Sequence, residues 1–218
     1  DIHEVTYTRV AGNGFEENDE VGVFALVGSS TMKEERYADN LRFFRTSEKV
    51  FESSEPIYYP DDEVTLRLIS YYPYQEEGVN MGESTMSVAV ETDQNLSAGY
   101  FCSDFLVASQ NLQSAPKGAI ALHYDHKFFK LKIALVGKEG EELQGILDAD
   151  PKLSVCGFYT KAIYDFQKET YSAFSNEKSI TPAGKWEIQG DRLSGKEVIL
   201  IPQETTLGYQ YIVLDVGG

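Results

Sequence analysis

The sequence is short of several features that mark common classes of protein. It has 2 Cys and 1 Trp among 218 residues, and its 19 Lys and Arg are outnumbered by 35 Asp and Glu, which gives a formal charge of −16. A chain this acidic repels the phosphates of nucleic acid, so we expect no nucleic-acid partner. Repulsion from anionic lipid headgroups equally argues against membrane binding through surface charge.

Long hydrophobic runs are also absent. No apolar stretch approaches the ~18 residues that a membrane-spanning helix needs, so we expect no direct transmembrane span. The chain opens at Asp1 without a Met. We interpret it as a mature or trimmed chain from which a targeting segment has been removed.

The two cysteines do not indicate a disulfide framework. Cys102 and Cys156 lie far apart in the sequence, each in an apolar, strand-like context. They could form a bridge only if the fold brought their Cα atoms within about 7 Å. Two buried free thiols are the favoured interpretation, and a bridge or a metal site is the alternative.

The sequence does contain a series of short apolar segments with the alternation of half-buried strands. In the clearest one, Val64, Leu66 and Leu68 point to one face, while Thr65 and Arg67 point to the other. Further strands are expected at residues 2–10 (an edge strand), 19–26, 41–45, 49–51, 86–90, 104–108, 153–159, 163–166, 186–188, 197–201 and 209–214. Many short strands about 8–12 residues apart are typical of β-sandwiches, so the predicted fold class is all-β.

Residues 119–136 form the longest segment with a regular pattern. The alternation is continuous enough for one long strand, or for two strands that meet near residues 125–127. In the second case the meeting point would be a natural crossing between domains. The best helix candidate is 141–149, although Gly145 weakens it.

No group of residues has the spacing of a metal site. His123 and His126 lie three residues apart on a strand and face opposite sides, so they cannot share a metal ion without a bulge. By its phase His126 belongs with the inward-facing residues, and we interpret it as a hydrogen-bonded core histidine. The acidic segments at 61–63 and at Asp148/Asp150 lack the spacing of a Ca²⁺ loop and are interpreted as solvated turns.

Patterns for catalysis are equally weak. The sequence has no serine nucleophile elbow, and no pair of carboxylates is singled out for glycoside hydrolysis. Gly12-Asn-Gly14 is not followed by a helix that could cradle a phosphate. We therefore predict a non-enzymatic protein without a cofactor or metal. The aromatic group at residues 71–74 could stack on sugars, but core packing is its favoured role.

Four parts of the sequence, in order, resemble motifs of the fimbrillin-like family, the fimbrial proteins of Bacteroidetes. They are the strand at 19–25, the Tyr-Tyr-Pro hairpin at 57–74, the paired segments at 90–94 and 103–109, and the crossing at 122–131. His126 stands at the family histidine and Lys130-Leu131 at its Lys-Leu, whereas Phe129 stands where a small serine is common. The matches cover roughly residues 1–136, and the second half resembles the family only as a β-rich domain.

The resemblance implies two transthyretin-like β-sandwich domains in tandem, at residues 1–126 and 127–218. It also implies a lipid-anchored precursor at the outer membrane and a mature protein exposed at the cell surface in a fimbrium, with a role in adhesion. The partners would be other fimbrial subunits, of the same or another kind, and host or bacterial surface ligands.

The resemblance further implies assembly by donor strand exchange. In this family an arginine-directed protease removes the first strand of the mature chain, and a strand from the next subunit fills the groove. Carried over to this sequence, the cleavage site would be Arg9, just before the glycine-rich segment 11–14. The removable strand would be Ile2–Thr8, with Ile2, Glu4, Val5, Thr6, Tyr7 and Thr8 as its candidate residues. The alternative is that residues 2–10 are an ordinary first strand with a chance arginine.

The role within a fimbrium stays open at this point. The family's second domain commonly runs further than residues 215–218, where this chain stops. A stalk subunit, a tip, an anchor and an accessory protein are therefore all compatible with the resemblance. The alternative function is a surface lipoprotein that never polymerises and binds carbohydrate or protein ligands.

Overall fold

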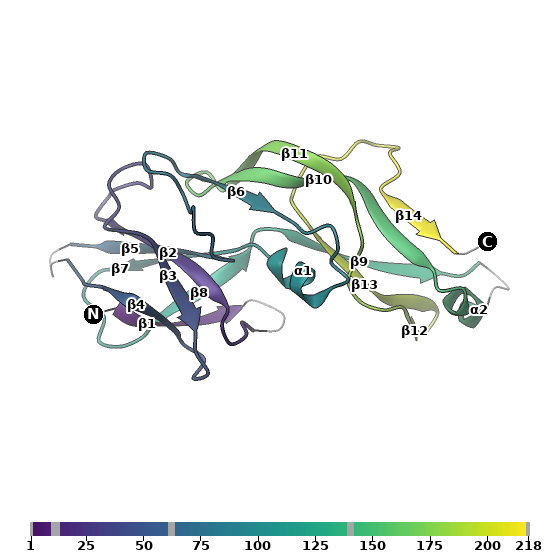
Figure 1. Ribbon diagram of the computed structural model, residues 1–218, viewed down its shortest axis with the longest axis horizontal. Coiled ribbons are helices and arrows are strands. Elements are labelled where there is room, and N and C mark those ends of the chain that lie inside the picture. The colour runs from purple at the N-terminus through teal and green to yellow at the C-terminus, as the bar shows by residue number, and fades with distance from the viewer. Residues whose placement is uncertain (1, 10–13, 61–63, 139–141, 217–218) are drawn as a thin grey trace. The chain divides into compact units, whose positions relative to one another are not determined.

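The computed structural model describes residues 2–9, 14–60, 64–138 and 142–216, which are almost all strands and loops, with two short helices among them (Figure 1). The predicted all-β class is confirmed. The chain divides into two compact units. Unit 1 comprises Asp1–Met86, Phe105–Lys127 and Tyr164–Thr170, and unit 2 comprises Ser87–Asp104, Phe128–Ile163 and Tyr171–Gly218.

The strands of unit 1 form a closed ring. Its described strands are β1 (Ile2–Arg9), β2 (Glu20–Val27), β3 (Ala38–Arg45), β4 (Phe51–Ile57), β5 (Leu66–Tyr72), β7 (Leu106–Leu112) and β8 (Ile120–His126). They pair in the order β1-β4-β3-β2-β5-β7-β8, and β8 returns to β1. Neighbours are antiparallel except β1 and β8, which run parallel. Strand pairing thus joins the two layers that a sandwich would keep as separate sheets.

Unit 2 contains two sheets. Its described elements are β6 (Thr85–Ala89), α1 (Ser97–Cys102), β9 (Phe129–Val136), α2 (Leu143–Asp148), β10 (Lys152–Asp165), β11 (Thr170–Ile180), β12 (Glu187–Gln189), β13 (Arg192–Leu200) and β14 (Ile212–Asp215). The first two residues of β6, the last two of β10 and the first of β11 count with unit 1. One sheet has the order β11-β10-β14, with β6 also paired to β10, and the other has the order β12-β13-β9.

Several expectations about individual elements can be compared with these bounds. The segment 119–136 is two strands, β8 and β9, so the two-strand alternative is confirmed. The helix predicted at 141–149 is α2. The prediction of a separate strand at 163–166 is wrong. Residues 163–165 are the end of the long strand β10, and the chain then turns.

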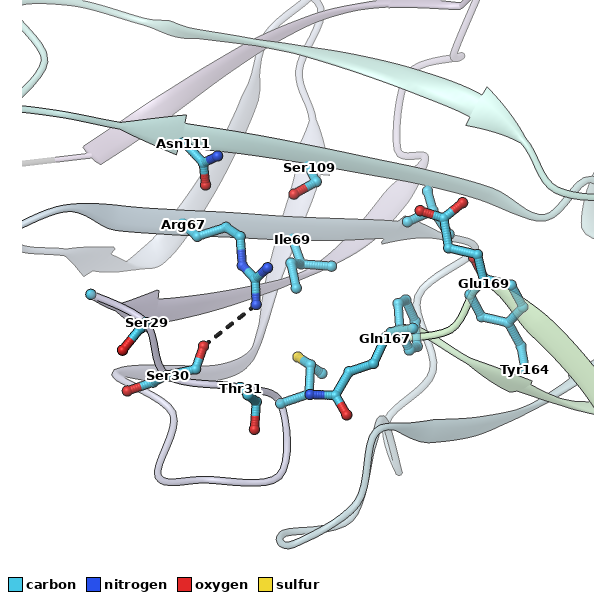
Figure 2. A pocket seen from close by; sticks show the side chains of 14 residues that line it. Ser29, Ser30, Thr31, Arg67, Ile69, Ser109, Asn111, Tyr164, Gln167 and Glu169 are labelled. Carbon is cyan, nitrogen blue, oxygen red and sulfur yellow. Dashed lines mark hydrogen bonds between the residues drawn. The ribbon is translucent and has the colours of Figure 1, made fainter.

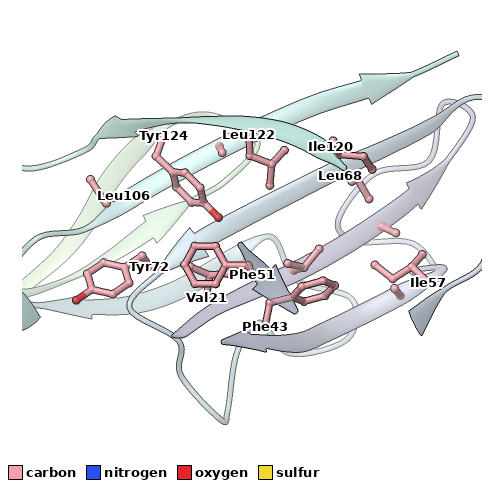
Figure 3. Close-up of a cluster of buried hydrophobic side chains, with 14 of the residues drawn as sticks. Val21, Phe43, Phe51, Ile57, Leu68, Tyr72, Leu106, Ile120, Leu122 and Tyr124 are labelled. Atoms are coloured by element: carbon pink, nitrogen blue, oxygen red, sulfur yellow. The ribbon is translucent and has the colours of Figure 1, made fainter. Parts of the chain in front are cut away.

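The core of unit 1 fills the inside of the ring (Figure 3). Its buried members are Phe15, Val21, Val23, Ala25, Ala38, Phe43, Phe51, Ile57, Leu66, Leu68, Tyr72, Leu106, Ala108, Ile120, Leu122 and Tyr124. Phe15 makes edge-to-face contacts with Phe51, Tyr72 and Tyr124, each with ring centroids 5.2 Å apart. Such pairs contribute about 0.5–1.5 kcal/mol each beyond the burial of their area. One loop aromatic residue therefore joins strands β4, β5 and β8.

A buried arginine, Arg36, binds the backbone carbonyls of loop segments that lie outside the strands of the ring. The side chain of Arg36 is 0% exposed, and its guanidinium lies 5.3 Å from the centre of the Phe24 ring. It donates to Asp39 Oδ1 (2.6 Å) and to the carbonyls of Met32 (2.9 Å), Val79 (2.6 Å), Asn80 (2.8 Å) and Glu83 (3.0 Å). A planar group with five N–H donors is suited to this task. Arg36 thereby replaces the strand pairing that residues 79–83 lack.

We expect Arg36→Leu to lower the free energy of unfolding by about 3–5 kcal/mol, because four carbonyls lose a charged donor. Urea denaturation followed by circular dichroism measures the change. The control is Arg42→Ala, which removes an exposed ion pair with Glu20 and should cost about 1 kcal/mol or less. Equal losses in the two variants would contradict this role for Arg36.

Candidate functional site

The strand β1 lies between β4 and β8, and this position makes it the first candidate for a functional element. It pairs antiparallel with β4, with Ile2 opposite Ile57 and Val5 opposite Phe51, and the register shifts between Ile2 and Glu4. It pairs parallel with β8 from Val5 opposite Ile120 to Arg9 opposite Tyr124. The prediction of an edge strand is therefore wrong. β4 and β8 each have one side that no other strand of the ring covers, and β1 pairs with both of these sides.

The residues predicted for strand exchange all fall in this element. Ile2, Glu4, Val5, Thr6, Tyr7 and Thr8 belong to β1, and Arg9 is its last residue. Of the glycine-rich segment that follows, residues 11–13 lie outside the described residues, as do residues 61–63 of the acidic turn. Cleavage at Arg9 and exchange of the strand stay predictions.

The neighbours of β1 show what the strand covers. On β8, Ile120, Leu122 and Tyr124 are at most 5% exposed and belong to the core cluster. On β4, Phe51 and Ile57 belong to the same cluster (Figure 3). The alternate residues of β8, Ala121 and His123, face outward and are exposed. Withdrawal of β1 would leave two rows of unpaired backbone groups beside an apolar slot.

The predicted histidine and cysteine environments need correction. His126 is exposed, not buried, because the inward alternation of β8 ends at Tyr124 and both following residues are exposed. Cys102 and Cys156 are not joined by a disulfide, but Cys102 is exposed, since it ends a short helix and not a strand. Cys156 is half-buried, with its Sγ 3.2 Å from Ser179 Oγ, where Gly157 at φ 72° interrupts the alternation of β10.

No metal site is formed by the described residues, where no group of three or more His, Cys, Asp or Glu side chains could hold an ion. Both helices in that part of the chain have six residues, and neither is long enough to cross a membrane.

The aromatic group at residues 71–74 serves packing, as the favoured interpretation expected. Tyr71 is 0% exposed and its ring stacks on Phe24 at 5.8 Å, while its hydroxyl donates to Asn40 Oδ1 at 2.7 Å. Burial raises the pKa of the Tyr71 phenol. A Cβ on Gly22 would lie 2.2 Å from this ring, so the glycine in the 19–25 motif is a requirement of close packing.

The motif at residues 90–94 has a structural role that its sequence did not reveal. The amide of Gln94 is fully buried and pairs with β13 as a strand backbone would: Nε2 donates to Ile199 O, and Ile199 N donates to Oε1, both at 2.8 Å. The backbone N–H of Gln94 donates to Thr181 O at 3.0 Å. Gln94 thus ties the loop before α1 to unit 2. This pairing could not be predicted from the sequence, where Gln94 is a single glutamine beside apolar residues.

We expect Gln94→Glu to destabilise unit 2 by about 2–4 kcal/mol, although the side chain keeps its shape. The reason is that a carboxylate oxygen would face the carbonyl of Ile199 where an N–H donor now lies. Urea unfolding followed by the fluorescence of Trp186, which lies in unit 2, measures this loss. Gln144→Ala on the exposed face of α2 is the matched control and should change stability by about 0.5 kcal/mol or less.

A cavity of about 430 Å³ lies on the outer face of β5 and β7 in unit 1 (Figure 2). It is lined by Gly28, Ser29, Ser30, Thr31, Met32, Arg67, Ile69, Val107, Ser109, Asn111, Tyr164, Phe166, Gln167 and Glu169. The Arg67 guanidinium points toward the loop, and its Nη2 lies 3.4 Å from Ser30 O. Glu169 is paired with Lys127 at 2.8 Å. Polar donors and acceptors therefore surround an apolar base.

A second cavity, of about 600 Å³, lies within unit 2. Its wall combines the lysines Lys152, Lys185 and Lys196 with Trp186. The indole Nε1 donates to Pro151 O at 2.9 Å, which fixes the ring in the wall of the cavity. Sequence reasoning missed this site, because its residues come from five separate segments.

Comparison with known proteins assigns the family. The model of the fimbrillin-like family matches residues 8–218, so the chain belongs to the fimbrillin-like family. This confirms the resemblance found in the motifs and extends it to the second half. The family supports a fimbrial-type protein of the cell surface.

Two crystal structures, both of proteins provisionally assigned to cell adhesion, share the fold. The one from Bacteroides uniformis superposes with a TM-score of 0.64 at 19% identity over 97% of this chain and 77% of that protein. The one from Bacteroides ovatus has a TM-score of 0.64 at 14% identity over 93% of this chain and 78% of that protein. At these identities the likeness concerns the fold. No curated protein matched the chain.

Proposed function

We propose that the protein is a non-enzymatic fimbrial subunit, or an accessory, anchor or tip protein of a fimbrium, that assembles with other subunits by exchange of β1. Membership of the fimbrillin-like family supports the fimbrial part of this proposal. The observation that carries the exchange mechanism is the place of β1 between β4 and β8. A lipid-anchored precursor at the outer membrane and a role in adhesion complete the proposal.

The acceptor is the slot that β1 fills. If β1 leaves, the ring opens between β4 and β8, and the inward side chains Ile120, Leu122 and Phe51 lose their cover on that side. An incoming strand with alternate apolar residues would restore both the ladder hydrogen bonds and the core. Because the loss is large and local, the opened subunit has a strong tendency to take up a strand from a neighbour.

The C-terminal segment has the properties of a donor. β14 pairs with β10 through four residues only, from Val155 opposite Ile212 to Lys152 opposite Asp215. Its consecutive apolar residues Ile212, Val213 and Leu214 are all exposed, as is Val216 after it. Exposed apolar residues in a short edge strand favour pairing with another chain. We propose that this segment, in another copy, fills the slot of β1.

We also propose that the chain folds as two transthyretin-like β-sandwich domains in tandem, at residues 1–126 and 127–218. The passage from unit 1 to unit 2 between Lys127 and Phe128 supports this division. Residues 87–104 and 164–170 are the exceptions, since each packs with the unit of the other half.

We expect an arginine-specific protease to make one early cut, after Arg9, and the remainder to stay folded and form polymers. Circular dichroism and size-exclusion chromatography of the cut protein measure the two outcomes. Arg9→Lys is the matched control, because it keeps the charge but removes the cleavage site, so this variant should stay intact and monomeric. Scattered cuts, or unfolding without polymers, would count against strand exchange.

The cavity of unit 1 favours a second candidate function, in which the protein binds a carbohydrate without polymerising. Arg67, Ser109, Asn111 and Gln167 line this space together with Ile69 (Figure 2), and Val107 adds to its apolar lining. A few directed polar groups over an apolar base are typical of small-ligand sites.

If this second function is correct, a strictly monomeric sample should bind glycans on an array, and Arg9→Ala should leave the binding unchanged. Arg67→Ala should weaken it at least about tenfold, because hydrogen bonds from a charged donor are lost. Arg42→Ala, on an exposed part of β3, is the control. Unchanged binding by Arg67→Ala would exclude this cavity as the binding site.

A further inference from the structure

The cavity of unit 2 gathers positive charge in a strongly acidic chain. The whole sequence has a formal charge of −16 and only 19 Lys and Arg. Three of these, Lys152, Lys185 and Lys196, line one cavity of about 600 Å³, whose acidic member is Asp150. Ammonium groups gathered in one cavity repel one another unless a counter-charge lies among them.

The described residues neutralise this charge only in part. Lys152 pairs with Asp150, but both side chains are largely exposed, at 72% and 78%. Among the described residues, Lys185 and Lys196 have no carboxylate at ion-pair distance. Lys185 and Lys196 therefore line the cavity without an ion-pair partner among the described residues, and Asp150 acts on Lys196 only beyond ion-pair distance.

The environment of Lys196 disfavours its charged form. Burial lowers the pKa of its ammonium below the usual value, and the charge of Lys152 lowers it further, while Asp150 opposes the shift. A like charge acts in this way only at short range. An anion in the cavity would offset both the desolvation and the repulsion.

The remaining wall is suited to a ring with hydroxyl groups. Asn95, Ser154 and Thr181 supply an amide and two hydroxyls, and Leu147, Pro151, Leu153 and Trp186 supply an apolar surface. A volume of this size is within the range of small-molecule sites, about 300–1,000 Å³. A bare inorganic anion would fill a small part of it and leave the apolar surface uncovered.

We propose that this cavity binds an anionic saccharide, with its sulfate or carboxylate group among the three lysines and its ring against the apolar wall. Lysine ammonium groups act as compact point charges and suit either anion. The hydroxyls of the sugar would meet Asn95, Ser154 and Thr181. The site lies wholly in unit 2 and shares no residue with the cavity in unit 1. Because Lys152, Leu153 and Ser154 also pair with β14, the binding is measured on the uncut, monomeric protein.

Trp186 allows a direct test, because it is the only tryptophan in the sequence and it lines the cavity. The probes are a sulfated heparin disaccharide, a galacturonic acid disaccharide, lactose as a neutral disaccharide and sodium sulfate. We expect a saturable change in Trp fluorescence with one or both charged disaccharides, weakened by added NaCl. Lactose should give no saturable change, and sodium sulfate should bind at least tenfold more weakly.

The variants locate the site. Lys185→Ala with Lys196→Met should weaken the charged disaccharide at least tenfold, and the Met keeps the apolar stem of Lys196. The control, Lys161→Ala with Lys178→Ala, removes the same charge from exposed positions on β10 and β11 of the same unit and should bind as the wild type does. Circular dichroism confirms that each variant is folded.

Three results would overturn the proposal. They are equal affinity in the two double variants, sulfate binding as tightly as the disaccharide, and the absence of a saturable signal with both charged disaccharides. If Lys185→Ala with Lys196→Met does not fold, Lys185→Ala alone serves as the test, and unchanged affinity in it has the same meaning.

Discussion

The pairing of β1 with both β4 and β8 is the constraint on which unit 1 depends. Without it the ring is an open sheet whose two ends, β4 and β8, have free backbone groups next to buried Phe51, Ile120 and Leu122. The pairing with β8 is parallel, unlike every other neighbouring pair in the ring. A strand that replaced β1 would therefore have to pair with both neighbours, one in parallel and one in antiparallel orientation.

Two buried polar side chains satisfy backbone groups of loops, as strand pairing satisfies those of the ring. Arg36 satisfies the carbonyls of the segment 79–83, and Gln94 pairs with Ile199 as a short stretch of backbone would. Both segments are loops, which cannot be buried unless their polar groups find partners. The long loops of this chain are therefore part of its packed structure. Assembly by exchange of one strand could leave these contacts intact, since none of them involves β1.

Much of the fold could be predicted from alternation alone. β2 and β5 were evident because Val21, Val23, Leu66 and Leu68 repeat with period two, and α2 was found despite Gly145. β11 (Thr170–Ile180) was missed because its residues are mostly exposed and polar, so the sequence has no apolar period there. The position of β1 inside a ring could not be foreseen either, since a weakly alternating first strand looks the same whether one or two neighbours pair with it. The cavities bring together residues distant in sequence, and Lys196 stands in no motif.

Locking β1 in place tests the central claim most directly. Thr6 and Ala121 are register partners on β1 and β8, and Ala121 is exposed, so cysteines at these two positions, with Cys102 and Cys156 changed to serine, would tie the strand to its neighbour. After cleavage by the arginine-specific protease, the oxidised protein should stay monomeric on size-exclusion chromatography, and reduction should start assembly. Polymers that form equally well from the oxidised, cross-linked protein would contradict the account.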